Sequence, residues 1–376
     1  MNITVERERL EKVLYYIQNI VEKKTTMPVL SHCLLSVDKK CIEVYATDLE
    51  ISYSTSIDSS SDEKGKLVLP AKKFFEIIKE IPTKEIQIKT EDNFWVTVLS
   101  DKNISFRLAG LNPEDFPNIQ RFNEASFSNI SSEILNEMID YTIYAVSTDE
   151  TRYNLTGVLF EVTIIKNKSK IIMIATDGHR LSMSEKVIDD FDLKMTKGII
   201  LPRKGLIELK KMIEKSKEAG LAFVNNNFVT KVDGSILSMR LIEGEFPDYK
   251  GVIPKAFKRR AIFKKNDILS ALKRASIMLS TGKFQGIKLT LDGKKMEVFA
   301  NNPDIGSFKE DMDIEFEGEK IEIGFNSSYL LDALVSFKGE DIICELNDEL
   351  NQAALKQKIS SKDDNSVLAV VMPMRL

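Results

Sequence analysis

Histidine and cysteine are scarce in this chain of 376 residues, which has 2 histidines and 3 cysteines. His32 and His179 are too few for a multi-histidine metal site, and no Cys-x-x-Cys pair offers thiolate ligands. Cys33, Cys41 and Cys344 are widely spaced and odd in number, so we interpret them as free thiols in a reducing cytoplasm. The sequence therefore predicts neither a metal ion nor a cofactor.

Long hydrophobic runs are also absent. The longest, VLAVVMPM, is far shorter than the ~20 apolar residues that a membrane-spanning helix needs. The opening MNITVERERL is charged from Glu6 to Arg9 and has no apolar signal-peptide core. P-loop, GxGxxG and GxSxG motifs are missing, which removes the common nucleotide-binding and serine-hydrolase signatures. We expect a cytoplasmic protein that does not contact a membrane.

Three phrases recur along the chain, in the same order each time. The first phrase contains a polar turn and stands at 45–51, 174–181 and 299–305. The second is an apolar run that leads into a helical pattern, at 67–81, 199–213 and 323–337. The third surrounds a proline, at Pro117, Pro247 and Pro373. A period of roughly 130 residues is the size of one domain, so we predict three tandem domains of one fold at 1–120, 121–250 and 251–376.

Each repeat is predicted to hold two helices, because apolar residues recur there at helical spacing. The six predicted helices cover 6–21, 70–81, 131–146, 202–217, 264–279 and 326–338. Pro70 and Pro202 suit a first helical turn, and Asn326 or Ser327 can cap the last helix. Short β-like runs lie between the helices, with connections too short for parallel crossovers. The predicted fold class is α+β, with two helices packed on antiparallel sheets in each domain.

Positive charge is concentrated on these helices, although the whole chain carries a formal charge of −4. Arg203, Lys204 and Lys210 lie on the most basic helix, whereas the helix at 131–146 is acidic. The helices could be ordinary solvated faces, or they could form a surface that meets phosphates without reading bases. A domain of this size is roughly 35 Å across, so six in a ring, but not three, leave room for a duplex roughly 20 Å wide.

One phrase, ATDGHRL, invites a catalytic interpretation through Asp177, His179 and Arg180. No nucleophile stands at a recognisable spacing from them, and the first repeat keeps Thr47 and Asp48 without a histidine. We therefore favour a structural Thr-Asp turn, with His179 on a binding surface. Besides a protein that binds a duplex, two functions stay open: an enzyme that acts on DNA ends through Asp177 and His179, and a scaffold protein that does not bind DNA.

Over its whole length the sequence resembles the bacterial sliding clamp family, the β subunits of DNA polymerase III. The resemblance rests on these phrases, in the family's order: MNITVERERL, PVLSHCLL, ATDLEI, LPAKKFFEI, FPNI, ATDGHRL, LPRKGLIEL, EGEFPDY and VMPMRL. It implies the DNA clamp fold, a head-to-tail homodimeric ring of six domains with helices inside and sheets outside. It also implies a processivity factor without catalysis, which encircles duplex DNA non-specifically.

The resemblance further implies a groove between the second and third domains that binds a short, partly apolar peptide. The expected partners are the DNA polymerase III alpha subunit, the clamp loader and other clamp-motif proteins. The positions that match the family's groove are Leu155, Thr176, Gly178, His179, Arg180, Leu181, Pro247, Val252, Val370, Val371, Met372, Pro373, Met374, Arg375 and Leu376.

Two further sets of residues follow from the same resemblance. The positions that match DNA contacts of the family are Lys24, Lys72, Tyr153 and Asn154, to which the charge pattern adds Arg203, Lys204 and Lys210. The positions that match the hydrophobic contact between the two protomers are Phe106, Leu108, Met278 and Leu279.

Overall fold

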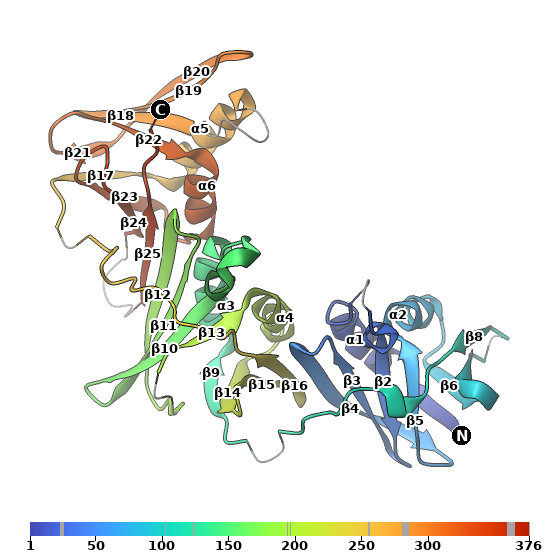
Figure 1. The fold of residues 1–376 in the computed structure, drawn as a ribbon. Helices are drawn as coiled ribbons and strands as arrows, with labels where there is room; N and C mark the ends of the chain where they lie inside the picture. Colours follow the sequence, from blue (N-terminus) through green and yellow to red (C-terminus); the bar gives the residue numbers. More distant parts are fainter. Residues whose placement is uncertain are drawn as a thin grey trace. The chain divides into compact units, whose positions relative to one another are not determined.

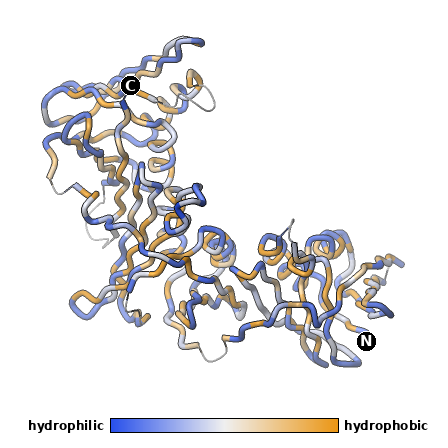
Figure 2. The backbone as a smooth tube through the Cα atoms, viewed as in Figure 1, coloured by the Kyte–Doolittle hydropathy of each residue, from blue (hydrophilic) through white to orange (hydrophobic). Residues whose placement is uncertain are grey.

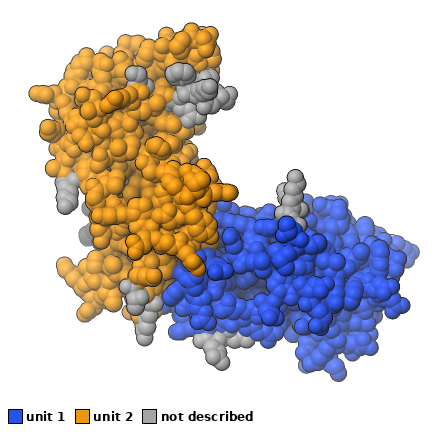
Figure 3. Space-filling view, in the orientation of Figure 1, with its two compact units in different colours: residues 1–136, 204–241 blue, residues 137–203, 242–376 orange. Residues whose placement is uncertain are grey.

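The structure is a computed structural model, and the residues that it describes are 1–22, 26–101, 103–122, 125–193, 195, 197–254, 256–279, 286–358 and 365–375. Two predicted site residues, Lys24 and Leu376, lie outside the described residues. The chain divides into two compact units, which Figure 3 colours separately. The first unit comprises residues 1–136 and 204–241, and the second comprises residues 137–203 and 242–376.

An antiparallel sheet of twelve strands supports the first unit (Figure 1). Its strands are β1 (Asn2–Glu6), β2 (His32–Val37), β3 (Cys41–Thr47), β4 (Ile51–Ser61), β5 (Gly65–Pro70), β6 (Glu85–Thr90), β7 (Trp95–Leu99), β8 (Ser105–Ala109), β9 (Ser128–Ser131), β14 (Glu218–Val224), β15 (Asn227–Val232) and β16 (Ser235–Arg240). The main path runs β8-β7-β6-β1-β4-β16-β15-β14-β9, and β3, β2 and β5 continue from β4 as a branch.

The pairing of β4 with β16 joins the first repeat to part of the second. Ile51 lies opposite Met239 and Tyr53 opposite Leu237 in this ladder. The Tyr53 hydroxyl also donates a 3.0 Å hydrogen bond to the Ser235 hydroxyl. Because backbone pairing runs across the repeat boundary, the compact units do not follow the sequence repeats, and the three domain boundaries stay a prediction.

Two antiparallel sheets form the second unit. The larger one contains β10 (Gly157–Ile165), β11 (Lys168–Thr176), β12 (Arg180–Ile188), β13 (Ile199–Pro202), β17 (Arg259–Lys264), β21 (Glu315–Glu317), β23 (Asp341–Leu346), β24 (Ala353–Gln357) and β25 (Asn365–Val371). Its order is β13-β10-β11-β12-β25-β24-β23-β17-β21. The smaller sheet contains β18 (Gly286–Asp292), β19 (Lys295–Asn302), β20 (Gly306–Asp313) and β22 (Ile321–Asn326), in the order β20-β19-β18-β22.

All six predicted helices are confirmed, and with the antiparallel sheets they confirm the α+β fold class. They are α1 (Arg7–Ile17), α2 (Ala71–Glu80), α3 (Ser132–Thr142), α4 (Arg203–Ile213), α5 (Lys265–Met278) and α6 (Ser327–Ser336). In each repeat a strand leads directly into each helix: β1, β9 and β17 precede the first helix, and β5, β13 and β22 precede the second. The repeated phrases of the sequence therefore mark a repeated strand–helix unit.

The helix starts differ slightly from the prediction. Pro70 and Pro202 are the last residues of β5 and β13, not members of the first helical turn. Pro70 keeps an extended backbone, with φ −64° and ψ 105°, because it still pairs with His32 of β2. Asn326, rather than Ser327, caps α6, and its side chain accepts a 3.0 Å hydrogen bond from the Ser328 amide.

The core lies where the apolar stripes of the helices meet the sheets. Apolar and polar residues alternate along many strands (Figure 2), as half-buried sheets require. Helix α1 buries Leu10, Leu14 and Ile17, and α2 buries Phe74 and Ile78 on the face it turns inward. Burying one such side chain contributes about 1.5–3 kcal/mol, so this stripe is what holds the short helices in place.

Candidate functional site

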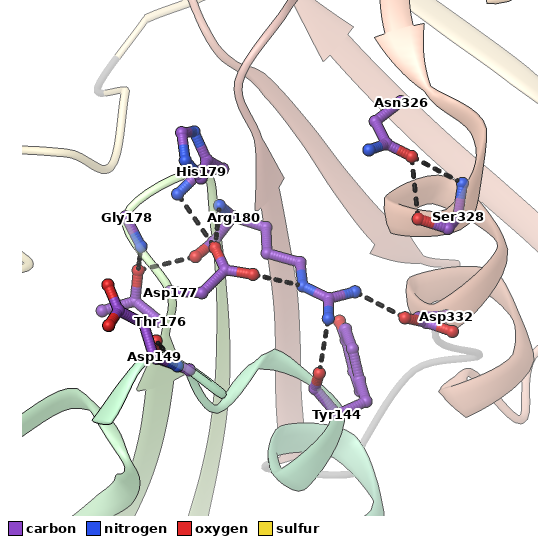
Figure 4. A network of polar contacts seen from close by, with 11 residues as sticks. Tyr144, Asp149, Thr176, Asp177, Gly178, His179, Arg180, Asn326, Ser328 and Asp332 are labelled. Atoms are coloured by element: carbon purple, nitrogen blue, oxygen red, sulfur yellow. Dashed lines mark hydrogen bonds and ion pairs between the residues drawn. The ribbon is translucent and has the colours of Figure 1, made fainter. Parts of the chain in front are cut away.

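The ATDGHRL phrase forms the turn that joins β11 to β12 (Figure 4). The Thr176 hydroxyl accepts a hydrogen bond from the Gly178 amide at 3.1 Å and donates one to the Arg180 carbonyl at 2.6 Å. Asp177 Oδ1 accepts from the amides of His179 and Arg180, at 2.9 and 3.0 Å. Gly178 has a φ of 90°, which glycine adopts without strain. Thr176 and Asp177 therefore build the turn, and the prediction of a structural Thr-Asp turn is confirmed.

Arg180 fastens this turn to two other segments of the second unit (Figure 4). Its guanidinium donates to Asp177 Oδ2 at 3.0 Å, to Asp332 Oδ2 of α6 at 2.6 Å and to the Tyr144 carbonyl at 2.7 Å. It also lies 4.6 Å from the centre of the Tyr329 ring. Burial favours the neutral form, but hydrogen bonds and charges from Asp332 and Asp177 outweigh it and raise the pKa of Arg180. Arg180 therefore stays charged and links the turn to α6 and to the segment around Tyr144.

The segment that ends in Met374 lies against the same turn. Strand β25 pairs with β12, so Val371 lies opposite Arg180 and Val370 opposite Leu181. Beyond the strand, the Met372 amide donates to the His179 carbonyl at 2.9 Å. We call residues 176–181 and 370–374 together the turn–tail surface.

Part of the turn–tail surface is apolar and exposed. Met372 and Met374 expose 38% and 39% of their surface, although the Met374 amide is held by the Gly324 carbonyl at 2.9 Å. Leu181 and Val370 are buried below them. Pro373 is half-buried and Arg375 is exposed. Exposed methionines over a rigid floor are typical of surfaces that accept varied apolar partners.

Residues 242–254, which belong to the connection between β16 and β17, pack against the strands that carry this surface. Phe246, Tyr249 and Ile253 belong to one apolar cluster with Leu181 and Val370. Two other predicted groove residues of this connection, Pro247 and Val252, are exposed, Val252 by 39%. The structure thus gathers the turn, the tail and the connection on one set of strands.

The last predicted groove residue, Leu155, is 95% buried in a short helical segment at Glu150–Leu155. That segment is tied to the connection by Asn154, whose side-chain amide donates to the Glu245 carbonyl at 2.7 Å. The buried side chain of Leu155 therefore holds this segment from the inside and is not part of its exposed surface.

Catalytic chemistry finds no support in this arrangement. Both carboxylate oxygens of Asp177 are engaged by the turn amides and by Arg180, so Asp177 is not poised as a base. The His179 ring is stacked on Tyr329 with the two ring centroids 6.4 Å apart, and among the described residues its ring nitrogens make no hydrogen bond to Asp177. Within the described ranges, no group of three His, Cys, Asp or Glu side chains could hold a metal ion.

Two contributors to the site were not identified from the sequence. Tyr329 and Asp332 both come from α6, one helical turn apart, and both contact Arg180. The spacing of three residues would have placed them on one helix face. Their partner lies about 150 residues earlier in the chain, so no local pattern could have connected them to ATDGHRL.

The predicted DNA contacts lie at several places in the two units. Tyr153 is 51% exposed, Arg203 is exposed at the start of α4, and Lys72 and Lys210 are half-buried. Lys204 has a different environment, because its ammonium contacts the Asp48 carboxylate and donates to the Ile20 carbonyl at 3.0 Å. The charge of Lys204 is therefore already compensated within the first unit.

The predicted protomer contacts lie on two elements, β8 and α5. Phe106 is half-buried and Leu108 is buried on β8 of the first unit. Met278 and Leu279 are partly buried against the core of the second unit, next to Ile277, which is 73% exposed.

None of the helices formed by the described residues has the length and apolarity to cross a membrane.

Comparisons with known proteins cover the whole chain. Models of the DNA polymerase III beta subunit match its N-terminal domain at residues 1–120, its central domain at 129–248 and its C-terminal domain at 250–375. The chain is 32% identical to the beta sliding clamp of Vibrio cholerae and 33% identical to that of Proteus mirabilis, with 100% of both proteins covered.

Solved structures of such proteins are also similar to this chain over its whole length. The DNA polymerase III subunit beta of Pseudomonas aeruginosa aligns with a TM-score of 0.89 at 31% identity. A sliding clamp from Bartonella birtlesii, bound to griselimycin, aligns with a TM-score of 0.92 at 29% identity. Each alignment covers 100% of both chains, so the likeness extends to the whole fold.

Proposed function

Because this chain belongs to the family of DNA polymerase III beta subunits, the beta sliding clamps, we propose that two copies close into a ring around duplex DNA. A sliding clamp is a processivity factor without catalytic activity, so its task is to hold other proteins on DNA. One observation carries this conclusion: the three domains of the family match in order along the chain. The proposed location is the cytoplasm, where a bacterial clamp has access to the chromosome.

Two exposed sheet edges support the homodimer. Strand β8 ends the path of the twelve-stranded sheet, and β20 ends the four-stranded sheet. Edge strands present unpaired backbone groups that another strand can satisfy. We propose that β8 of one protomer pairs with β20 of the other, twice in a closed ring. Head-to-tail contact of this kind closes when two copies complete the circle.

The side chains of the two edges suit one another. Phe106 and Leu108 on β8, like Phe308 and Met312 on β20, are at least partly buried and alternate along the strand with exposed residues. The exposed side of β8 carries Arg107, which pairs with Glu91, and that of β20 carries Lys309, Asp311 and Asp313. Pairing the strands would bring apolar residues together on one face and would place Arg107 near the exposed face of β20, which has a net negative charge. The half-buried Met278 on α5 lies in the same unit as β20, and α5 is linked to β20 by an ion pair between Arg274 and Glu310.

Replacing Met278 by glutamate is expected to convert the dimer into monomers. A carboxylate placed in an apolar contact without a partner costs several kcal/mol, which corresponds to at least a hundredfold weaker association. Size-exclusion chromatography with light scattering should show the mass halved. Val335→Glu is the matched control, because Val335 is 64% exposed on α6, and this variant should remain a dimer. An unmutated chain that is monomeric at micromolar concentration would contradict the ring.

We propose that duplex DNA meets the basic helices without base-specific contacts. Arg203, Lys72 and Lys210 provide the positive charge, and the exposed Tyr153 provides an additional contact. Lys204 instead positions the Asp48 turn, because its ammonium is bound there. Loose phosphate contacts let a ring slide, because they hold the protein near the DNA at any sequence.

The experiment that tests this function compares circular with linear DNA. After loading by a clamp loader, the protein should remain on a nicked circle during gel filtration and should leave once a restriction enzyme cuts the circle. Topological retention explains this result, because a ring slides off a free end. Protein that stays on the linear product would indicate ordinary binding. Turnover of labelled DNA ends that is lost in His179→Ala would instead favour the enzyme.

We propose that the turn–tail surface, with Val252 and Pro247, is where partners dock. Its exposed Met372 and Met374 would receive the apolar side chains of a short peptide, and the turn would offer polar groups at the rim. The proposed partners are the polymerase III alpha subunit, the clamp loader and other proteins that carry a similar peptide. Support comes from the rigid floor, since Arg180 and the ladder between β12 and β25 fix the surface in advance.

A further inference from the structure

The turn between β3 and β4 repeats the ATDGHRL turn bond for bond. The Thr47 hydroxyl accepts from the Leu49 amide and donates to the Ile51 carbonyl, both at 2.9 Å. Asp48 Oδ1 accepts from the amides of Glu50 and Ile51, at 3.0 and 2.6 Å. These are the same donors and acceptors, at the same spacings, as in residues 176–180. The first unit therefore contains a second copy of the turn.

The strand beside the second copy is equivalent too. Strand β16 pairs with β4 as β25 pairs with β12, so Met239 lies opposite Ile51 as Val371 lies opposite Arg180. The frame that carries the turn–tail surface is thus built twice in the chain, once in each unit.

Two residues of the first turn differ in ways that alter its surface. Leu49 occupies the position of Gly178 and has a φ of 78°, a left-handed conformation that strains a leucine. Its side chain is 53% exposed, so burial does not repay that strain. Glu50 occupies the position of His179, which places a carboxylate where the second turn has an imidazole. An exposed, strained leucine beside an acid suggests a role outside the fold itself.

A pocket opens beside this turn. The turn, strand β4 and the chain from Phe116 to Phe122 line it, and its cavity volume is about 140 Å³. Its apolar lining includes Leu49, Ile119 and Ile236. A single water needs roughly 10–15 Å³ of such volume, so the cavity has room for a side chain.

The charge at the pocket that has no partner is negative. Asp48 is buried and neutralised by Lys204, so it adds no free charge. Glu50 also lines the pocket, is exposed, and makes no ion pair with any described residue. The pocket therefore combines apolar side chains with polar ones such as Asn118 and Gln120, and it has one uncompensated carboxylate at its rim.

We propose that this pocket is a second peptide-docking site, which binds an extended segment of a partner protein that carries leucine or phenylalanine next to lysine or arginine. The apolar side chain would enter between Leu49 and Ile119, and the basic side chain would pair with Glu50. The site carries an exposed carboxylate, Glu50, where the turn–tail surface has the His179 imidazole, so the two surfaces select different peptides. The proposal does not depend on the ring or on DNA binding.

The test uses the full chain and two fluorescein-labelled peptides, Gly-Leu-Lys-Leu-Phe-Gly and the same peptide with glutamate in place of lysine. Fluorescence anisotropy should show that the lysine peptide binds about tenfold more tightly. In Glu50→Lys the preference should reverse, because the charge at the rim is reversed. Glu63→Lys is the matched control, because Glu63 is exposed elsewhere on the first unit, and it should keep the original preference.

A second variant separates docking from folding. Leu49→Gly restores the residue type of the second turn, so its melting temperature should not fall, yet its affinity for the lysine peptide should fall at least fivefold. The double variant Met372→Ser with Met374→Ser, which alters the turn–tail surface, should keep the charge preference.

Equal binding of the two peptides, or a preference that survives Glu50→Lys, would overturn the proposal. Assembly beyond the dimer that Ile119→Glu abolishes, without peptide binding, would assign the pocket to another copy of this chain and would equally overturn it. Neither result bears on retention on circular DNA, so the two proposals fail separately.

Discussion

Replacing Arg180 by methionine is expected to lower the free energy of unfolding by about 3 kcal/mol, because the partly buried groups that bind its guanidinium would lose their partner. Methionine fills much of the same space but donates no hydrogen bond. Asp177, whose side chain is only 14% exposed, would keep its charge without the guanidinium, and the Tyr144 carbonyl would lose its donor. Urea denaturation at neutral pH, followed by circular dichroism, measures the change.

The matched control is Arg152→Met, in a neighbouring segment of the same unit. Arg152 pairs with Asp149 at 3.2 Å, but both side chains are more than 40% exposed. Exposed pairs of this kind contribute at most about 1 kcal/mol, so this variant should unfold near the urea concentration of the unmutated chain. A similar decrease in the free energy of unfolding for both variants would show that the contacts of Arg180 do not stabilise the second unit more than an exposed ion pair does.

Deleting Met374 to Leu376 is expected to weaken binding of a peptide from the polymerase III alpha subunit by about a hundredfold. The deletion removes an exposed methionine from the turn–tail surface, together with the hydrogen bond from its amide to the Gly324 carbonyl. Without that bond, Pro373 loses its anchor, so the peptide would also have to order it on binding, whereas Met372 keeps its own bond to the His179 carbonyl. Isothermal titration calorimetry with the synthetic peptide measures the affinity.

The double variant Met372→Ser with Met374→Ser keeps the backbone and should reproduce most of the loss. Leu350→Ser is its control, because Leu350 is 62% exposed elsewhere in the second unit and its replacement should leave the affinity unchanged. All these variants should remain dimeric, since the proposed protomer contact lies on β8, β20 and α5. Unchanged affinity in the deletion would rule out the turn–tail surface as the docking site.

Local patterns were enough to predict the elements. The apolar stripe that begins at Leu10 located α1, and the repeated apolar run before 71–80 located α2 and its two counterparts. Helix ends were less certain: α1 stops at Ile17, although the stripe continues to Val21. Helix ends depend on the chain that follows, which a periodic pattern does not describe.

Long-range partners were not predictable from single residues. Lys204 reads as one more charge on a basic helix, yet it contacts Asp48 about 150 residues away. Arg180 reads as a member of a polar motif, yet Asp332 and Tyr144 determine its position. Such pairs depend on which strands lie side by side, and only the assembled sheets specify that.

Strand β25 follows every other strand of the nine-stranded sheet in the chain, yet it lies inside that sheet, between β12 and β24. Domains begin to fold while the ribosome is still adding residues, from the N-terminal side onward. Until residues 365–371 emerge, β12 and β24 each keep an open edge, where a neighbouring nascent chain could pair instead. We therefore expect the second unit to be completed last, and a chain interrupted before Asn365 to be prone to aggregation and proteolysis.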